Sequence, residues 1–355
     1  MPVEAPSRVA LVAGAGGVVG RALIEHLSAD PQWHRVIGLA RRGGPQYGHL
    51  SHVAVDLLDA ASCARVASSL QDVTHVFYAA YLADTDLATE CRLNMAMLDN
   101  LVTALEPLAP HLSHIQLMQG SKWYGNHLGP YRTPALEDDQ RHKAPCFYYD
   151  QQDWLAARQK SRAWSWSAVR PHGVLGLAIG SSMNQLTAMA LYASVMKELA
   201  QPLRWPGSEA AFDTLYQFTE AAYLARGAAW IASNRSLENT AVNFTNGDAV
   251  RWRHLWPAIA QAIGMKPAPP APQTLAETMP AHEPLWATMR ARYGLADYTM
   301  ADLTNWRFAD FVFHCGYDQM SDLTRLRNAG WLGVNSSEAM YVRLVGDLRA
   351  RRIIP

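Results

Sequence analysis

The sequence predicts an α/β fold, with a doubly wound parallel sheet in the first half of the chain and a mainly helical region in the second half. Three observations support this prediction. Short apolar runs alternate with amphipathic stretches, their spacing matches that of β-α-β units, and the rhythm changes to longer helical stretches from about Gly176. Alternation of this kind places parallel strands between helices that cover both faces of the sheet.

The apolar runs that predict strands are Val9–Ala13, Val36–Ala40, Val53–Val55, His75–Ala79, His114–Met118 and Ser167–Val169. Amphipathic stretches between them predict helices, among them Leu87–Leu105 and Trp154–Arg162. In the second half we expect helices at Asn184–Leu199 and Glu220–Ser233, and one further short strand at Ala241–Phe244. The segment Lys266–Gln273 reads KPAPPAPQ, which is too rich in proline for a helix or a central strand, so we expect a surface connection there.

Composition excludes several classes of function. The chain of 355 residues is 49% hydrophobic and 17% charged, as is usual for a soluble globular protein. Lys plus Arg and Asp plus Glu both total 31, so no net charge favours nucleic acid or an anionic membrane. The four cysteines form no CxxC pair and the 13 histidines form no HExxH motif, so we expect no metal site. Without a signal peptide or an apolar run of ~20 residues, a cytoplasmic protein is expected.

Residues 8–20 read RVALVAGAGGVVG, a strand followed by a glycine-rich turn and the start of a helix. Glycines in this GxxGxxG spacing let the turn close tightly, let backbone amides approach a pyrophosphate and let the helix pack on the sheet. The pattern therefore predicts a Rossmann fold, with a strand–turn–helix that binds no ligand as the alternative. The expected dinucleotide contacts in the turn are Gly14, Gly16, Gly17, Val18 and Val19.

The second strand decides which cofactor is expected. It runs into Arg41 and Arg42, with no acidic residue nearby. An acid at this place binds a free ribose 2′-hydroxyl, whereas arginine binds a 2′-phosphate, which two guanidinium groups can hold by bidentate hydrogen bonds. We therefore predict NADPH, and a solvated basic turn is the alternative. Asp56 is placed to accept a hydrogen bond from the adenine amine, or else to cap the next helix. Further cofactor contacts are expected from Leu57, Ala79, Met118 and Val174.

The YxxxK motif, which places the catalytic tyrosine and lysine of many such enzymes on one helical face, is absent. Tyr148 has Gln152 four residues later, and Tyr149 has Asp153. Three other segments stand out, namely GSKWYG at Gly120–Gly125, CFYYDQQDW at Cys146–Trp154 and WSWSAVRPHGVLG at Trp164–Gly176. Taken alone, Lys122 is better explained as a surface lysine, and Tyr148 is equally well explained as an aromatic core residue or a packing residue at a helix start.

At these segments the sequence resembles the progesterone 5β-reductase/iridoid synthase (PRISE) family of extended short-chain dehydrogenases/reductases, whose members have KxYxGP-like, NFYY and WSxxRPxxxxG segments. THVFYAAY at Thr74–Tyr81, FTNGDAVRWRHLW at Phe244–Trp256 and the terminal RRIIP are also similar, so the resemblance covers nearly the whole chain. It looks like a bacterial member of the family. The resemblance implies an NADP-binding Rossmann domain at residues 1–175 and a mainly helical substrate-binding region at 176–355, with elements that return to the Rossmann sheet.

The same resemblance implies that Lys122 and Tyr148 form the catalytic pair, with the lysine coming from a different strand end than the tyrosine's own helix. It also implies reduction of the activated C=C bond of an α,β-unsaturated carbonyl compound with NADPH. Tyr148 would hydrogen-bond the carbonyl oxygen as enolate charge develops, and Lys122 would support Tyr148 and bond the nicotinamide ribose. Two alternatives stay open: 1,2-reduction of an aldehyde or ketone by the same groups, and a non-catalytic NADPH-binding sensor or scaffold.

Departures from the family pattern affect the expected substrate. The family often has tryptophan where Tyr81 stands and histidine where Trp123 stands. The expected pocket residues are Tyr81, Trp123, Met183, Tyr341 and Trp252, although side chains of this kind more often pack in a core. His172 is placed to contact the nicotinamide region, but a loop histidine satisfied by backbone groups is the favoured interpretation. A small enone or carbonyl compound is the expected partner, and a homodimer is one possible assembly.

Overall fold

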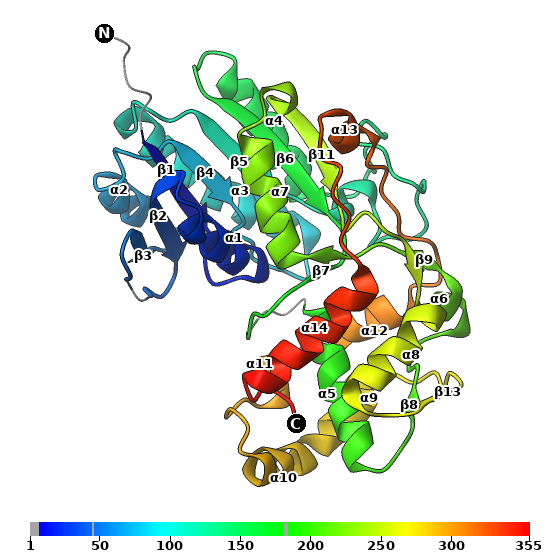
Figure 1. Cartoon of the computed structure of the whole chain (residues 1–355). Coiled ribbons are helices and arrows are strands. Elements are labelled where there is room, and N and C mark those ends of the chain that lie inside the picture. The colour runs from blue at the N-terminus through cyan, green and yellow to red at the C-terminus, as the bar shows by residue number, and fades with distance from the viewer. Residues whose placement is uncertain (1–6, 45, 181–183) are drawn as a thin grey trace.

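The computed structural model describes residues 7–44, 46–180 and 184–355. Within these residues the central element is a seven-stranded parallel sheet in the order β11-β6-β5-β4-β1-β2-β3. Figure 1 shows this sheet, which the first half of the chain forms together with β11 from the second half, and most helices of the second half packed together beyond it. Its strands are β1 (Arg8–Ala13), β2 (Trp33–Ala40), β3 (Leu50–Ala54), β4 (His75–Tyr78), β5 (His114–Met118), β6 (Ser165–Pro171) and β11 (Thr240–Phe244).

Both faces of the sheet are buried. Successive strand residues point to opposite faces, so each strand contributes side chains to two separate clusters. In β1, Leu11 and Ala13 belong to one apolar cluster, and Ala10 and Val12 belong to another. The first face is covered by α2 (Ala60–Ala67), α3 (Leu87–Leu105) and α4 (Phe147–Gln159), and the second by α1 (Val18–Ala29) and α7 (Ala221–Ala232). The prediction of a doubly wound α/β fold is therefore confirmed.

The predicted strands and helices are confirmed, and the main difference concerns α4. The expected helix at Trp154–Arg162 begins earlier, at Phe147, and ends at Gln159. Its first turn carries three aromatic residues, which are weak helix formers, but Phe147 and Tyr149 are buried there. Tertiary packing overrides the local preference in this turn.

The second region is mainly helical and has its own apolar core. Its helices are α5 (Gln185–Glu198), α6 (Glu209–Asp213), α8 (Trp252–Ile263), α9 (Leu275–Thr278), α10 (Glu283–Tyr293), α11 (Met300–Leu303), α12 (Trp306–His314) and α14 (Ser337–Ala350). Helix α13 (Thr324–Asn328) lies beside β11 instead, where Leu326 is buried against the sheet (Figure 1). Short 3-10 turns occur at η1 (Glu106–Leu108), η2 (Ser121–Tyr124), η3 (Arg235–Leu237) and η4 (Met279–His282). Small strand pairs are β7 (Val174–Leu175) with β10 (Thr219–Glu220), β9 (Leu215–Tyr216) with β12 (Val250–Arg251), and β8 (Leu203–Arg204) with β13 (Pro267–Ala268).

Strand β13 lies within the proline-rich segment for which a surface connection was expected. The pairing is possible because the amide of Leu203 donates to the carbonyl of Lys266, so the missing N–H of Pro267 is not required. The rest of the segment forms no helix or strand, as predicted. Strand β11 and helix α7 join the sheet from beyond residue 176, and the division of the chain at 175/176 stays a prediction.

The strand order places a ligand site at one edge of the sheet. The chain order reverses between β1 and β4, which are hydrogen-bonded neighbours. In open α/β sheets, ligands bind outside the carboxyl ends of the strands at such a reversal. In the part of the chain that the structure describes, no helix combines the length and apolar character needed to cross a bilayer.

Candidate active site

The glycine-rich turn joins β1 to α1 at this reversal of strand order. Gly14 has a φ of +83°, and a Cβ there would lie 2.6 Å from the carbonyl oxygen of Ala79. A Cβ on Gly20 would lie 2.1 Å from the carbonyl oxygen of Gly14. Both positions require glycine, the first for its conformation and its contact with the loop after β4, and the second for the contact between α1 and the turn.

The open side of the turn suits an anionic group. A Cβ on Gly16 would meet no atom within 4 Å. Gly17 precedes α1, and Val18 and Val19 are its first residues, so their amide hydrogens have no acceptor within the helix. Unpaired amides at a helix N-terminus are a ready site for phosphate. The turn therefore fits a dinucleotide pyrophosphate.

The charged residues near β2 and β3 are exposed. Arg41 and Arg42 follow β2 directly, and neither forms an ion pair with another described residue. Asp56 accepts a hydrogen bond from the amide of Leu58 at 3.0 Å, whereas α2 is capped by Asp59. The capping interpretation of Asp56 is therefore wrong, because α2 begins only at Ala60. Its contact with adenine stays a prediction.

The remaining expected cofactor contacts lie at the same edge of the sheet. Ala79 follows β4, Met118 ends β5 and Val174 begins β7, and all three are half-buried. Leu57 is buried in the apolar cluster beside β3. Their positions agree with a cofactor laid across the strand ends, and the individual contacts stay predictions.

Tyr148 lies in the first turn of α4, at the carboxyl edge of the sheet. Its ring is half-buried, and a Cβ on Gly120 would lie 3.3 Å from its hydroxyl oxygen. Among the described residues this hydroxyl has no hydrogen-bond partner. Burial, with smaller contributions from Cys146 and Glu90, raises the pKa of Tyr148 above its ordinary value. The phenol is therefore protonated at neutral pH and free to donate a hydrogen bond.

Lys122 lies in η2, directly after β5, and its ammonium group contacts two side chains from elsewhere in the chain. Its Nζ donates to the hydroxyl of Tyr81 at 3.0 Å and to the two carboxylate oxygens of Glu90 at 3.2 and 3.4 Å. Tyr81 in turn donates to Glu90. Within the described residues, no hydrogen bond joins Lys122 to Tyr148.

Glu90 was not singled out from the sequence. It lies in the first turn of α3, where an acidic residue is commonly explained by its interaction with the helix dipole, so its type and position carried no special signal. Only the tertiary structure brings it to Lys122. Tyr81 also stacks on Phe147, with ring centroids 5.4 Å apart, and Phe147 packs against Tyr148.

A buried arginine orders the backbone around the two expected catalytic residues. Arg170 ends the apolar part of β6 and is 1% exposed. Its guanidinium donates to Gln119 at 2.9 Å, to Gln152 at 3.1 Å and to the carbonyl of Glu137 at 2.8 Å. Gln119 also donates to the carbonyl of Tyr148 at 3.1 Å. Gln152, at the position of the lysine in YxxxK, thus connects α4 to this network.

Arg170 was likewise not predicted as a site residue, although its position in the sequence carried a signal. An arginine that ends an apolar strand must be buried with partners, because its charge is always present. Burial lowers the pKa of Arg170 below its usual range without making it neutral. Its guanidinium lies 3.5 Å from the ring centroid of Trp123, a cation–π contact.

The expected substrate-pocket residues are dispersed. Trp123 is 3% exposed beneath Arg170, and Tyr341 in α14 and Trp252 in α8 are buried in the core of the second region. Tyr81 is half-buried beside Lys122. Met183 lies outside the described residues. Core packing accounts for Trp123, Tyr341 and Trp252 in this structure, and any contact of theirs with substrate stays a prediction.

His172 follows β6 and differs from the expectation of a loop histidine satisfied by backbone groups. Its ring is buried against Tyr216, with centroids 4.7 Å apart, and neither ring nitrogen has a hydrogen-bond partner among the described residues. Burial lowers the pKa of His172 to about 4, so the ring is neutral. The backbone interpretation is therefore wrong for its side chain, because the ring turns inward.

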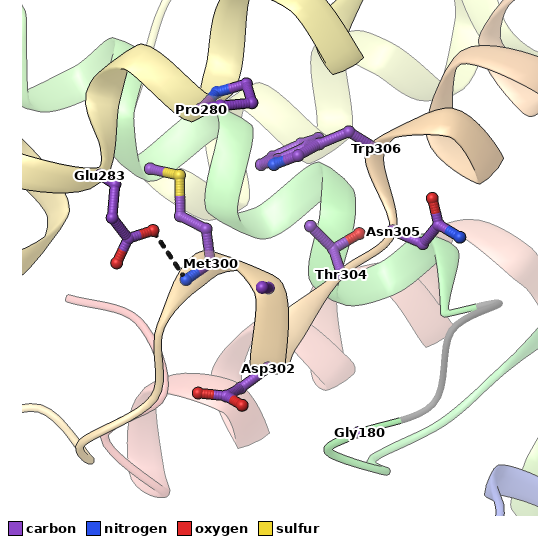
Figure 2. Close-up of a pocket in the computed structure, with 9 residues that line it drawn as sticks. Gly180, Pro280, Glu283, Met300, Asp302, Thr304, Asn305 and Trp306 are labelled. Carbon is purple, nitrogen blue, oxygen red and sulfur yellow. Dashed lines mark hydrogen bonds between the residues drawn. The ribbon is translucent and has the colours of Figure 1, made fainter.

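A separate hollow of about 590 Å³ lies in the second region (Figure 2). Apolar and acidic side chains share its wall, and Glu283 accepts a hydrogen bond from the amide of Met300 at 3.0 Å. The lining residues are Gly180, Pro280, Glu283, Met300, Ala301, Asp302, Thr304, Asn305 and Trp306. None of the predicted catalytic or cofactor residues is among them. Within residues 7–44, 46–180 and 184–355, no cluster of His, Cys, Asp or Glu is suited to a metal ion.

Comparisons with known proteins agree with this architecture. Residues 47–355 match the family model described as a PRISE-like Rossmann-fold domain. An (S)-8-oxocitronellyl enol synthase of Camptotheca acuminata is 31% identical over 98% of this chain and 93% of its own length. A 3-oxo-Delta(4,5)-steroid 5-beta-reductase of Arabidopsis thaliana is 30% identical over 100% of this chain and 95% of its own length. The crystal structure of the Bordetella bronchiseptica enzyme WbmG in complex with NAD superposes with a TM-score of 0.68 at 15% identity, covering 100% of this chain and 98% of that one.

Proposed function

The chain belongs to the PRISE family of NAD(P)-dependent oxidoreductases, and from this premise we propose that it reduces the activated C=C bond of α,β-unsaturated carbonyl compounds with NADPH. The observation that carries the proposal is the Tyr148 hydroxyl, which is protonated and has no partner among the described residues. A free donor at the carboxyl edge of the sheet is suited to an oxygen that gains charge during reduction.

The names of the relatives indicate the class of substrate. One is a reductase of 3-oxo-Delta(4,5)-steroids, in which a double bond is conjugated with a ketone. The other is named for an enol product, and an enol is what hydride addition to the β-carbon of an α,β-unsaturated carbonyl compound gives before the α-carbon takes up a proton. Both agree with hydride addition remote from the carbonyl oxygen.

The cofactor site fits NADPH. When bound, NADPH supplies the hydride that is transferred to the β-carbon of the alkene. The amides at the start of α1 and the open face at Gly16 would hold the pyrophosphate. Arg41 and Arg42, exposed and without ion-pair partners among the described residues, would hold the 2′-phosphate.

The chain's own groups act on the oxygen and on the cofactor ribose. Tyr148 donates a hydrogen bond to the carbonyl oxygen, and this bond strengthens as enolate charge develops. The ammonium group of Lys122 donates to Tyr81 and Glu90, and 27% of the Lys122 side chain is exposed. We propose that this side chain also binds the nicotinamide ribose, with one of its three donors.

The position of the transferred hydride tests the proposal. Incubation with 2-cyclohexen-1-one and NADPH deuterated at the transferable C4 position should place deuterium at C3 of cyclohexanone. The Tyr148→Phe variant should give the same product more slowly. Deuterium in an allylic alcohol would make the protein a carbonyl reductase. A lack of turnover with a panel of enones and carbonyl compounds, despite NADPH binding, would make it a cofactor-binding sensor.

A further inference from the structure

We propose that Glu90 is a positioning residue for Lys122: its buried carboxylate, together with Tyr81, holds the lysine in the place that YxxxK enzymes obtain from a single helix. The proposal rests on the proposed function and identifies a group that the sequence did not indicate. It concerns the geometry of Lys122 and not a direct contact of Glu90 with substrate.

The backbone around Lys122 does not fix the position of its ammonium group, so other side chains must do so. In a YxxxK motif, the spacing of four residues on one helix sets the distance between lysine and tyrosine. Here Lys122 lies in a four-residue 3-10 turn, and Tyr148 lies in the first turn of a separate helix. A lysine side chain has four rotatable carbons and loses much freedom when it is fixed, so acceptors must hold it.

Glu90 supplies these acceptors from the protein interior. Its side chain is 4% exposed, whereas that of Lys122 is 27% exposed. Both carboxylate oxygens face the ammonium, at 3.2 and 3.4 Å, and one also accepts from Tyr81. A carboxylate this deeply buried must be paired and hydrogen-bonded, and Lys122 is the cation that the structure places against it.

The segments that carry the two holding residues are themselves fastened together. Asn94, one helical turn beyond Glu90, donates to the carbonyl of Leu82 at 2.7 Å and accepts from the amide of Leu82 at 2.9 Å. Leu82 is the neighbour of Tyr81, so this pair of bonds ties the loop that carries Tyr81 to the helix that carries Glu90. The side-chain amide of Gln151 in α4 also donates to the backbone carbonyl of Asn94 at 2.9 Å, which connects the arrangement to the helix of Tyr148.

The charge of the pair is consistent with a neutral Tyr148. The negative charge of Glu90 offsets that of Lys122, and Glu90 adds to the effect of burial in raising the pKa of Tyr148. Lys122 therefore does not serve mainly to ionise Tyr148, and its proposed role is to bind the cofactor ribose beside a protonated phenol.

A double-mutant cycle with Glu90→Gln and Lys122→Ala tests the proposal. Glu90→Gln keeps the shape of the side chain and removes its charge. In the otherwise unchanged protein it should lower kcat with 2-cyclohexen-1-one about 10-fold, as is usual for coupling between contacting groups. In the Lys122→Ala background it should change kcat by less than about 2-fold, because the group through which it acts is gone. Equal losses in the two backgrounds would overturn the proposal.

A readout that needs no turnover separates this inference from the proposed function. Acylation of Lys122, followed by mass spectrometry of the cofactor-free protein, should be faster in Glu90→Gln than in the unchanged chain, with Lys197 as the internal reference. Lys197 is bonded to the carbonyl of Ile263, far along the chain from this cluster. An unchanged rate at Lys122 would overturn the proposal even if the enzyme reduces enones. Faster acylation without any enone turnover would leave it standing while the proposed function fails.

Two further variants separate a specific effect on Lys122 from a general loss of stability. Glu106, directly after the opposite end of α3, is half-buried and paired, with Arg158 and Arg162 at 2.7 and 2.6 Å. Glu106→Gln should therefore lower stability without changing kcat or the acylation of Lys122. Glu90→Asp keeps the charge on a shorter side chain and should retain more activity than Glu90→Gln. If Glu90→Gln does not fold, Glu90→Asp must still show the faster acylation for the proposal to stand.

Discussion

The adjacent tyrosines at positions 148 and 149 should respond in opposite ways when each loses its hydroxyl group. The Tyr148 hydroxyl has no partner among the described residues. The Tyr149 hydroxyl donates to the carbonyl of Trp123 at 2.5 Å and accepts from the amide of His142 at 3.1 Å, and its residue is 8% exposed. The first hydroxyl is available for chemistry, whereas the second holds the backbone of the loop before α4.

The expected magnitudes follow from these environments. Tyr148→Phe removes no bond from the described structure, so the free energy of unfolding should change by less than about 0.5 kcal/mol. It removes one donor to the developing oxyanion, so kcat should fall by about 10²–10³-fold, or 2.7–4 kcal/mol. Tyr149→Phe leaves a buried carbonyl and a part-buried amide without their partner and should cost about 1–3 kcal/mol of stability. Its kcat should fall by only a few-fold.

Two assays on the same preparations decide the matter. Urea unfolding followed by tryptophan fluorescence gives the stability, and loss of NADPH absorbance with 2-cyclohexen-1-one gives kcat. Slow turnover should persist in Tyr148→Phe, because binding and orientation remain. If Tyr149→Phe is inactive and stable while Tyr148→Phe is fully active, the catalytic phenol has been placed one residue out of register.

Four further predictions address the cofactor, the glycine turn and pH. Replacing Arg41 and Arg42 together with Ala should weaken NADPH selectively in a fluorescence titration, and equal affinity of the unchanged protein for NADH and NADPH would refute the assignment. Gly20→Ala should cost about 1–3 kcal/mol of stability, because its Cβ would lie 2.1 Å from the carbonyl oxygen of Gly14. Gly16→Ala should leave the urea midpoint nearly unchanged, because no atom lies within 4 Å of its Cβ, but should weaken NADPH binding; normal binding would place the pyrophosphate elsewhere. Burial lowers the pKa of His75 to about 4 and of His114 to about 3, from 6.5, so the unfolded chain takes up protons that the folded state does not. The urea midpoint should therefore decrease as the pH is lowered from about 7 to about 5. A midpoint that increases as the pH is lowered over this interval would contradict the linkage.

The cofactor half of the site could be predicted because its signals are local. The glycines of the turn, the apolar runs and the arginines after the second strand are each short segments whose meaning depends on neighbouring residues. The resemblance at Lys122 and Tyr148 extended this prediction to the two residues expected to act on substrate. The helix of Tyr148 was placed too late in the chain, because burial of Phe147 and Tyr149, and not helix propensity, starts it.

The sequence by itself determined the α/β class, the turn between β1 and α1 and the family of the chain, because periodicity and glycine spacing are properties of contiguous residues. The tertiary structure decided which groups surround the expected catalytic pair. Glu90 and Lys122 are 32 residues apart, and Arg170 and Gln119 are 51 apart, so no spacing rule along the chain connects them. These partners meet because parallel strands bring their carboxyl ends to one edge of the sheet, where a buried charged group must be hydrogen-bonded or paired.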